Sequence, residues 1–438
     1  MTLPATRYIG ESVLRIEDTR VLTGGGRYVD DLQLTGMLHA VFVRSPLAHA
    51  RITSVDVSRA RTLPGVVDVI TAEELAEGTT PMAVHADIPN YRSPIFRPLA
   101  TDKARHVGDP IALVVAESRP AAEDARDAVE VDYDPVDVVM TADDARDERR
   151  PAVFEDMGSN VAFTDARTFG DPDTAFAAAD RVVRLSLRTP RALHVPLDTR
   201  GGVAEYDRGT GELLYHAATQ APHPLRMGLA EILRHPADRL HIVTPDIGGA
   251  FGQKGFMARE DVCVCFASRK LGRPVKWVED RVENLTSATH GRGEWMDLAA
   301  AVREDGTILG LDARMVIDAG SYPLPFPSVM FGGIVRTVLP GPYRIDHLRW
   351  EETDVVTNKS SFGPYRGPWA VETLARELLV DRVAAELGLD PVDVRRRNLV
   401  PLEEQPRKMP SGASLEGVRA VAALARAVEL LDAEWLEG

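Results

Sequence analysis

Alternating hydrophobic and polar residues predict closely spaced strands and helices in the first third of the chain. Residues 37–46 (MLHAVFVRSP) alternate as a strand, and residues 50–58 continue this pattern. Residues 110–118 are apolar at almost every position, which predicts a buried strand, and a helix over 119–129 and a strand over 130–139 follow. Strands that alternate with helices predict an α/β domain over residues 1–145.

A charged and nearly aperiodic stretch, residues 141–160, predicts a linker to a larger second region over 146–438. The apolar pattern of this region predicts strands over 180–190, 201–207, 211–219, 240–247, 295–304 and 308–318, with helices near 223–234 and 257–271. A helix near 376–389 should end at Gly388, and Pro391 should open the next one. The overall expectation is an α+β fold.

The last segment carries one apolar stripe at helical spacing. Its members lie three and four positions apart: Val421, Leu424, Val428, Leu431 and Trp435. Such a stripe predicts a helix that packs either on the rest of the chain or on another polypeptide.

Composition narrows the function classes. The 438 residues are 44% hydrophobic and 27% charged with a net charge of −15, which is typical of a soluble globular protein and argues against a nucleic-acid partner. The start of the chain lacks a signal-peptide core, and no apolar run is long enough to span a bilayer, so no membrane insertion is expected. Cys263 and Cys265 are too few for an iron–sulfur cluster or a structural zinc and predict buried apolar positions in a reducing, cytoplasmic protein.

Three loops hold the candidate chemistry. The first, residues 244–260 (TPDIGGAFGQKGFMARE), is rich in glycine and lacks the order of a P-loop or a dinucleotide-binding turn. By itself it is either a structural turn or a loop that cradles an anion or cofactor. Gln220 ends a strand and is either a loop residue or a hydrogen-bonding group in a cleft. Arg366, between aromatic, Gly and Pro residues, is either a structural ion-pair partner or a contact for an anionic ligand.

The three loops, in this order, resemble the molybdenum-binding large subunit of the xanthine dehydrogenase / aldehyde oxidase / carbon monoxide dehydrogenase family. Residues 26–52 and 105–117 resemble the N-terminal hammerhead α/β domain of that family. Residues 271–292 and 386–400 resemble its first molybdopterin-binding α+β domain. The resemblance implies a hammerhead domain over 1–145 and a first cofactor-binding domain with a C-terminal helix over 146–438.

The resemblance also implies roles for single residues. Gln220 matches the family's Thr-Gln motif, whose glutamine hydrogen-bonds an oxygen ligand of molybdenum. The residues of the glycine-rich loop that match the backbone lying against the metal centre are Gly249, Ala250, Phe251 and Gly252. Arg366 matches the arginine that reaches towards metal and substrate. No residue is expected to ligate the metal directly.

Several positions depart from the family pattern. Pro368 and Trp369 stand where xanthine oxidases carry a substrate-stacking phenylalanine, and Gly367 stands where carbon monoxide dehydrogenases carry a copper-binding cysteine. Gly255 replaces a glutamate that contacts purines. These departures argue against xanthine and carbon monoxide as substrates. Asp198-Thr199 occupies the place of a usual Glu-Pro pair, with no consequence that the sequence reveals.

The length implies that this chain is one half of a split molybdenum hydroxylase, because family large subunits are nearly twice as long. No catalytic residue is assignable here; the general-base glutamate is expected on a partner that supplies the C-terminal half. Glu205 and Glu260 have no motif behind them and are expected to be surface or structural carboxylates.

The implied activity is the oxidation of a small aldehyde or N-heterocycle with oxygen derived from water. The implied cofactor is molybdopterin cytosine dinucleotide with Mo, while [2Fe–2S] and FAD are expected on an iron–sulfur subunit and an FAD subunit. Two alternatives stay open: an inactive paralogue that serves as a scaffold or assembly subunit, and a fragment of a full-length enzyme.

Overall fold

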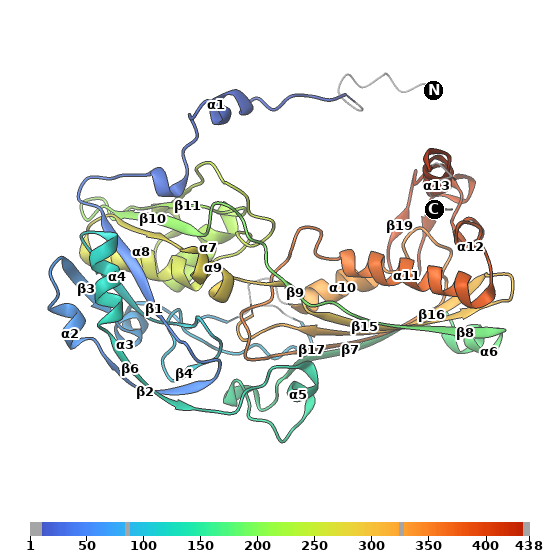
Figure 1. Cartoon of the computed structure of the whole chain (residues 1–438), viewed down its shortest axis with the longest axis horizontal. Helices are drawn as coiled ribbons and strands as arrows, with labels where there is room; N and C mark the ends of the chain where they lie inside the picture. Colours follow the sequence, from blue (N-terminus) through green and yellow to red (C-terminus); the bar gives the residue numbers. More distant parts are fainter. Residues whose placement is uncertain (1–10, 84–87, 324–327, 432–438) are drawn as a thin grey trace.

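The computed structural model describes residues 11–83, 88–323 and 328–431. Its largest sheet has seven strands in the order β12-β11-β10-β13-β1-β5-β3. The bounds of these strands are β1 Leu38–Arg44, β3 Val66–Ile70, β5 Pro110–Ala116, β10 Gly201–Tyr206, β11 Leu213–Ala217, β12 Leu240–Val243 and β13 Val275–Val278. The sheet forms one lobe of the molecule (Figure 1).

This sheet joins strands from both sides of residue 145. β1 pairs in parallel with β13, with Leu38 opposite Val275, and antiparallel with β5. β5 lies between β1 and β3 and is buried at every position, because both of its faces are covered. The hammerhead segment and the start of the second region therefore share one hydrophobic core.

Helices pack on this sheet and support the lobe: α3 Ala72–Gly78, α4 Arg119–Asp127, α7 Pro222–Ile232 and α8 Arg259–Leu271. α8 packs against β10 and β13. Its middle turns are almost wholly buried, including Cys263 and Cys265. It ends at Gly272, which has φ +64° and closes the helix in the left-handed conformation.

A three-stranded sheet in the order β4-β2-β6 completes the N-terminal part: β2 Ala50–Asp56, β4 Lys103–Ala104 and β6 Glu130–Pro135. The short helix α2 Ser58–Arg61 and α4 fill the space between this sheet and the seven-stranded one with small apolar residues. The N-terminal part also contains α1 Asp18–Leu22 and a 3-10 turn, η1 Val29–Asp31.

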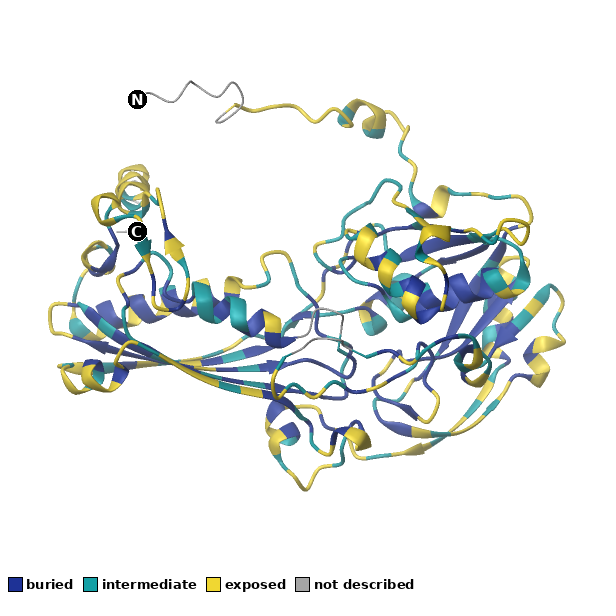
Figure 2. Ribbon diagram, turned by 180° about the vertical axis from the view of Figure 1, so that it is seen from behind, coloured by how far each residue is buried: buried dark blue, intermediate teal, exposed yellow. Residues whose placement is uncertain are grey.

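The second lobe is a long five-stranded sheet in the order β7-β17-β16-β15-β8. Its strands are β7 Val161–Phe169, β8 Arg181–Arg188, β15 Glu294–Val302, β16 Ile308–Asp318 and β17 Leu348–Val355. The helices α10 Ser328–Val338 and α11 Ala370–Leu387 lie along one face of this sheet, and the buried surfaces meet between the two layers (Figures 1 and 2).

α11 ends at Gly388, with φ +67°, and Pro391 opens the next helix, α12 Pro391–Asn398, as the sequence predicts. The remaining elements are short: α5 Ala142–Arg146, α6 Pro172–Ala177, α9 Arg281–Ser287, α13 Ala420–Leu430, β9 Arg191–Ala192 paired with β14 Gly291–Arg292, β18 Arg407–Lys408 paired with β19 Ser414–Leu415, and the 3-10 turns η2 Glu155–Met157, η3 Ala237–Arg239 and η4 Leu402–Glu404.

The structure contradicts one expectation from the sequence and confirms another only in part. The predicted linker, residues 141–160, is folded: Thr141 caps α5, and Val153 and Phe154 are buried in the main core. The terminal stripe does form a helix, α13, but none of its residues is fully buried, and only Ala420 and Leu424 pack partly against the second lobe. Trp435 lies outside the described residues. Within the described part, no helix is long and apolar enough to cross a membrane.

Candidate functional site

The glycine-rich loop connects β12 to α8, and three of its residues adopt the left-handed backbone conformation. Gly249, Phe251 and Gly252 have φ angles of +99°, +54° and +104°. Glycine enters this region without strain, whereas a Cβ makes it unfavourable. A Cβ on Gly252 would also overlap the carbonyl oxygen of Pro364. Glycine at position 252 therefore allows two chain segments to approach each other closely.

Gln220 follows the end of β11 and is tied to this loop by side chain and backbone. Its carbonyl Oε1 accepts the Gly252 N–H at 3.0 Å, and its own N–H donates to the Lys254 carbonyl at 2.8 Å. The Thr219 hydroxyl donates to the same carbonyl at 3.3 Å. Because Oε1 is engaged as an acceptor, the amide NH₂ of Gln220 is the donor that this exposed side chain can offer to a ligand.

Arg366 reaches the same loop from a third segment. Its N–H donates to the Phe251 carbonyl at 2.9 Å, and its guanidinium carbon lies 5.8 Å from the centre of the Phe251 ring. Both side chains are exposed. Gln220, the glycine-rich loop and Arg366 thus form one continuous, solvent-open face, although they come from three separate parts of the sequence.

A fourth segment, residues 194–198, completes this face, and the sequence assigned no role to it. The His194 ring Nε2 hydrogen-bonds the Pro364 carbonyl at 2.7 Å. Asp198 and Gly248 exchange two hydrogen bonds of 3.1 Å: the Asp198 N–H donates to the Gly248 carbonyl, and the Gly248 N–H donates to the Asp198 carboxylate. The departure from Glu-Pro at Asp198 was the one signal in the sequence that pointed to this segment.

Asp198 also forms an ion pair with Lys254, with 2.6 Å between Oδ2 and Nζ. The Lys254 side chain is fully buried and the Asp198 side chain is 15% exposed. Burial lowers the pKa of Lys254, and the hydrogen bond and charge of Asp198 oppose that shift. The Asp198 carboxylate therefore contacts both Gly248, where the loop begins to turn, and Lys254. The backbone carbonyl of Lys254 in turn accepts the N–H of Gln220.

Beneath the loop lies a buried ionic cluster. The Gln253 side-chain oxygen accepts from Asn284 at 2.8 Å, and Asn284 also donates to Glu279 at 2.8 Å. Arg200 pairs with Glu279 and with Glu260. A second arginine, Arg44, pairs with Glu260 at 3.0 Å. The positive charges of the two arginines overcome the effect of burial and lower the pKa of Glu260 to about 2.

The low pKa and the two arginine partners make Glu260 a weak base, which agrees with a structural role for this carboxylate. Glu205 lies in β10 opposite Leu214, away from the loop contacts described above. Glu260 is buried and lines the cavity described next, whereas Gln220, Phe251 and Arg366 are exposed on the open face.

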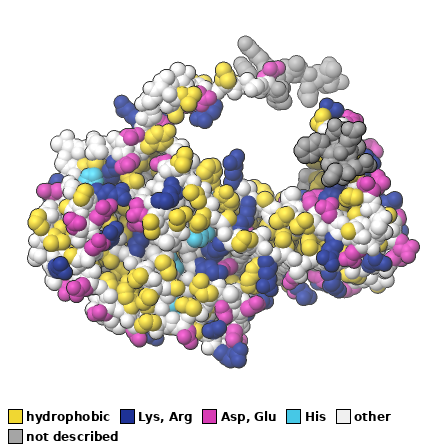
Figure 3. Space-filling model, in the orientation of Figure 1, with side chains coloured by type: hydrophobic (Ala, Val, Ile, Leu, Met, Phe, Trp, Pro, Cys, Tyr) yellow, Lys and Arg dark blue, Asp and Glu magenta, His cyan; other side chains and the backbone are white. Residues whose placement is uncertain are grey.

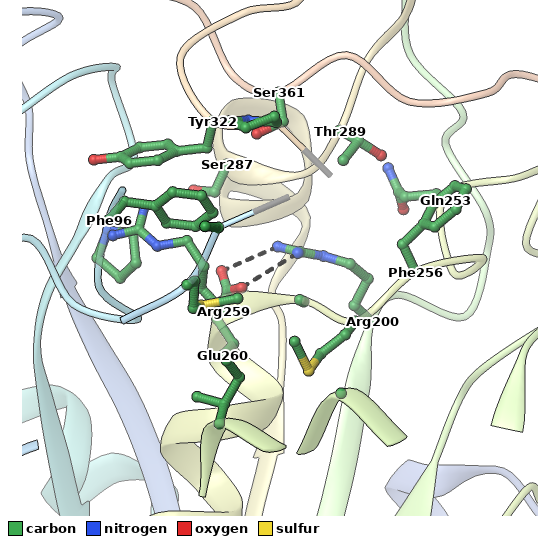
Figure 4. A pocket seen from close by; sticks show the side chains of 18 of the residues that line it. Phe96, Arg200, Gln253, Phe256, Arg259, Glu260, Ser287, Thr289, Tyr322 and Ser361 are labelled. Carbon is green, nitrogen blue, oxygen red and sulfur yellow. Dashed lines mark hydrogen bonds and ion pairs between the residues drawn. The ribbon is translucent and has the colours of Figure 1, made fainter. Parts of the chain in front are cut away.

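A cavity of about 250 Å³ adjoins this cluster (Figure 4). Its apolar and aromatic lining residues include Met82, Phe96, Phe256, Met257 and Tyr322. Its polar lining residues include Gln253, Thr289 and Arg259, each of which has one fully buried atom without a hydrogen-bond partner in the described structure. Since Gln253 and Phe256 belong to the glycine-rich segment, one stretch of chain borders both the open face and the cavity.

The two cysteines lie in α8 as free buried thiols, as the sequence predicts, and burial raises the pKa of each. Among the described residues, no cluster of three or more His, Cys, Asp or Glu side chains could hold a metal ion. The chemistry that this face can offer consists of backbone amides, one side-chain amide and one guanidinium, which suit the recognition of a polar or anionic cofactor.

Comparison with known proteins identifies two matching families. Residues 153–399 match the molybdopterin cofactor-binding domain, and residues 23–137 match the a/b hammerhead domain of aldehyde oxidase and xanthine dehydrogenase. The crystal structure of quinoline 2-oxidoreductase from Pseudomonas putida 86 superimposes with a TM-score of 0.94 and 36% identity, over 98% of this chain and 55% of that one.

Two curated relatives differ in length. The nicotine 6-hydroxylase large subunit of Paenarthrobacter nicotinovorans is 37% identical over 94% of this chain, which covers 51% of that protein. The chain spans about half the length of most curated relatives that it matches. The nicotinate dehydrogenase large molybdopterin subunit of Eubacterium barkeri is 29% identical, and the match covers 89% of both chains.

Proposed function

Because the chain belongs to the aldehyde oxidase and xanthine dehydrogenase family, with a molybdopterin cofactor-binding domain over residues 153–399, we propose that it is one half of a molybdenum hydroxylase large subunit. The observation that carries this proposal is the convergence of Gln220, the glycine-rich loop and Arg366. The Gly252–Gln220 and Arg366–Phe251 hydrogen bonds join them into one face. A scaffold would need none of this arrangement, which favours an active subunit.

The residues of this face fit a molybdopterin cofactor. Gly249, Ala250, Phe251 and Gly252 present backbone at a turn that a Cβ at position 252 would block. Gln220 offers an amide donor to an oxygen atom of the bound group, and Arg366 offers a guanidinium to a negative charge. When bound, such a cofactor supplies two-electron redox chemistry and activates oxygen derived from water.

The substrate, in this proposal, enters the cavity behind the glycine-rich loop. The cavity's aromatic rings, Phe96 and Tyr322, and its methionine thioethers suit a flat, apolar molecule. Gln253 and Arg259 also line this cavity, and their amide and guanidinium groups are the kind of donor that a ring nitrogen or carbonyl oxygen needs. We therefore propose a small N-heterocycle, with an aldehyde as the second choice.

The remaining parts come from partners. We propose that a second polypeptide supplies the other half of the cofactor site and the general-base glutamate. Glu260 lines the cavity but is held by Arg44 and Arg200, and Glu205 lies in β10. An iron–sulfur subunit and an FAD subunit would carry the electrons onward, and the cofactor would be the cytosine dinucleotide form. The match to the nicotinate dehydrogenase large molybdopterin subunit covers 89% of both chains. A relative of about this length supports the proposal of a natural split subunit.

The direct test is elemental analysis of the complex that the tagged chain forms in a host that makes the cofactor. We expect Mo close to one atom per chain, together with a second large-subunit polypeptide identified by peptide mass spectrometry. A complex that contains this second polypeptide but no Mo would favour the scaffold alternative.

A further inference from the structure

An arm, defined here as residues 11–22, is fastened beside the glycine-rich loop. The Arg20 guanidinium binds both carboxylate oxygens of Asp246, at 2.6 and 2.7 Å. Asp246 also accepts the Arg27 N–H at 2.8 Å and donates its own N–H to the Arg27 carbonyl at 2.9 Å. Asp246 lies just before Gly248 in the sequence, so the arm is attached to the same segment that we propose lies against the cofactor.

The arm carries large apolar side chains that the described chain does not cover. They are Val13, Leu14, Ile16 and Leu22, with exposed fractions of 67%, 86%, 94% and 83%. The helix in the arm, α1, has no buried residue. Several uncovered apolar side chains on one short segment are unfavourable in water and mark an interaction site.

The arm extends over a hollow in the molecule (Figure 3). The lobe of the seven-stranded sheet bounds this hollow on one side, and β9, the loop before α11, and α11 itself lie across it (Figure 1). The two loop segments there also expose apolar side chains: Leu193, Val195, Leu197 and Trp369. The arm and these loops therefore present apolar surface around one space, next to the glycine-rich loop.

We propose that the arm closes over the polypeptide that supplies the second half of the large subunit, with Leu14 and Ile16 packed against that polypeptide. This inference rests on the proposed function. The nicotine 6-hydroxylase large subunit and quinoline 2-oxidoreductase are about twice as long as this chain, so the second half is a body of similar size that would meet this chain at the proposed cofactor face. The arm is fastened at Asp246, in the segment that leads into the glycine-rich loop of this face.

The charge of the arm agrees with a protein partner. Acidic and basic residues are interspersed along it: Glu11, Arg15, Glu17, Asp18 and Arg20. A membrane surface or a nucleic acid would favour a cluster of basic residues instead. The exposed apolar side chains of the arm are then the part that would pack on a folded protein.

Hydrogen–deuterium exchange tests the inference without a variant. The tagged complex and the isolated chain are compared, and we expect the amides of residues 11–22 to exchange at least tenfold more slowly in the complex. Equal exchange in a complex that does contain the second-half polypeptide would overturn the arm proposal. If the complex contains no such polypeptide, the proposed function fails instead, so the two failures are distinguishable.

A variant pair sharpens the test. In Leu14→Asp/Ile16→Asp, two side chains that are exposed in the free chain become charged, so folding should be unaffected. We expect at least a tenfold rise in the dissociation constant for the second-half polypeptide, because two buried side chains of this size contribute that much. Val67→Asp, on the edge strand β3 far from the hollow, is the matched control.

Unchanged affinity in the Leu14→Asp/Ile16→Asp chain, or an equal loss in the control, would contradict the proposal. So would protection of residues 11–22 in the isolated chain equal to that in the complex, because a second copy of this chain would then cover the arm.

Discussion

At the scale of single residues, the contacts of Gln220 determine what its removal should do. Its side-chain oxygen accepts one loop N–H, and its amide NH₂ is the group that we propose faces the cofactor. Gln220→Ala should lower kcat about a hundredfold, since the loss of one positioned donor in a catalytic site costs about 3 kcal/mol. Mo content should stay close to that of the unchanged complex. Gln33→Ala, an exposed loop glutamine elsewhere, is the control, and unchanged turnover in Gln220→Ala would show that this glutamine only closes the loop.

The Asp198–Lys254 pair leads to a second residue-scale prediction. In Asp198→Asn the buried ammonium of Lys254 loses its counter-ion, which costs about 3 to 5 kcal/mol for a buried pair. The loop should then shift, and the complex should retain less Mo. In the double variant Asp198→Asn/Lys254→Met both charges are gone, so Mo retention should recover.

Asp198→Glu, which keeps the charge, should retain more Mo than Asp198→Asn. Elemental analysis of the unchanged complex and the three variants checks this order. Equal Mo loss in the single and double variants would mean that the carboxylate acts in some way other than neutralising Lys254.

The sequence could name residues that the structure brings together on the open face, and their role at a cofactor stays a prediction. It could not predict the contacts that hold them. Gln220, Phe251, Gly252 and Arg366 were predicted from motifs that stand in a recognisable order. Their convergence into one face follows from hydrogen bonds between segments that are far apart along the chain. The role of Asp198 was not predictable, because an ion pair with a lysine in a distant loop leaves no periodic pattern in the sequence.

At the scale of elements, the glycine-rich loop depends on backbone conformation more than on side chains. Gly252 combines φ +104° with the carbonyl of Pro364 in the place of a Cβ. Gly252→Ala should therefore strain the loop by about 1 to 3 kcal/mol and abolish Mo retention. Gly333→Ala is the matched control, because a Cβ there meets no atom within 4 Å. Full Mo content in the Gly252→Ala complex would show that the loop can move without loss of the site.

Strand β17 predicts a dependence of stability on pH. Burial raises the pKa of Glu352 and of Asp354, and the charge of Asp354 raises the pKa of Glu352 further. Above the ordinary pKa range of carboxyl groups, the unfolded chain therefore loses these two protons while the folded chain still retains them. The free energy of unfolding should therefore fall as the pH rises from the ordinary carboxyl pKa to the raised pKa of the folded chain. The slope is up to about 1.4 kcal/mol per pH unit for one proton.

Glu352→Gln should weaken this pH dependence, since the amide resembles the protonated acid. Thermal unfolding of the chain between pH 5 and 9 measures the slope. The neighbouring Glu351→Gln, on a partly exposed carboxylate that pairs with Arg314, should leave the slope unchanged. Parallel slopes for Glu352→Gln and the unchanged chain would exclude Glu352 as the titrating group.

Most elements were predictable because their apolar periods are strong. The strands over 295–304 and 308–318 correspond to β15 and β16, and the helices near 223–234 and 257–271 correspond to α7 and α8. The linker prediction over 141–160 was wrong because its few apolar residues, such as Val153 and Phe154, show no local period and are buried by distant elements. The joining of β1 to β13 could not be predicted, since pairing between strands so far apart along the chain has no local signal.

At the scale of the whole molecule, apolar side chains beside the proposed cofactor face and the hollow are not covered by any other part of the described chain. Phe251, Trp369 and Leu197 are exposed beside the proposed cofactor face, with Leu197 93% exposed. Apolar surface contributes about 25 cal/mol for each Å² removed from water, so these side chains should drive the chain either onto its partner or onto other copies. Glu260 is held by Arg44 and Arg200, and Glu205 lies in β10, so we propose that the base comes from the partner.

The last prediction follows from these two features: the isolated chain is inactive and self-associates. Light scattering after size exclusion should show species larger than 47.9 kDa, and assays with an artificial electron acceptor should show no turnover. Co-expression with the second-half polypeptide should restore a defined complex, Mo and activity together. A stable monomer that hydroxylates substrate without any partner would contradict the split-subunit proposal, because both the base and the rest of the cofactor site would then have to lie in this chain.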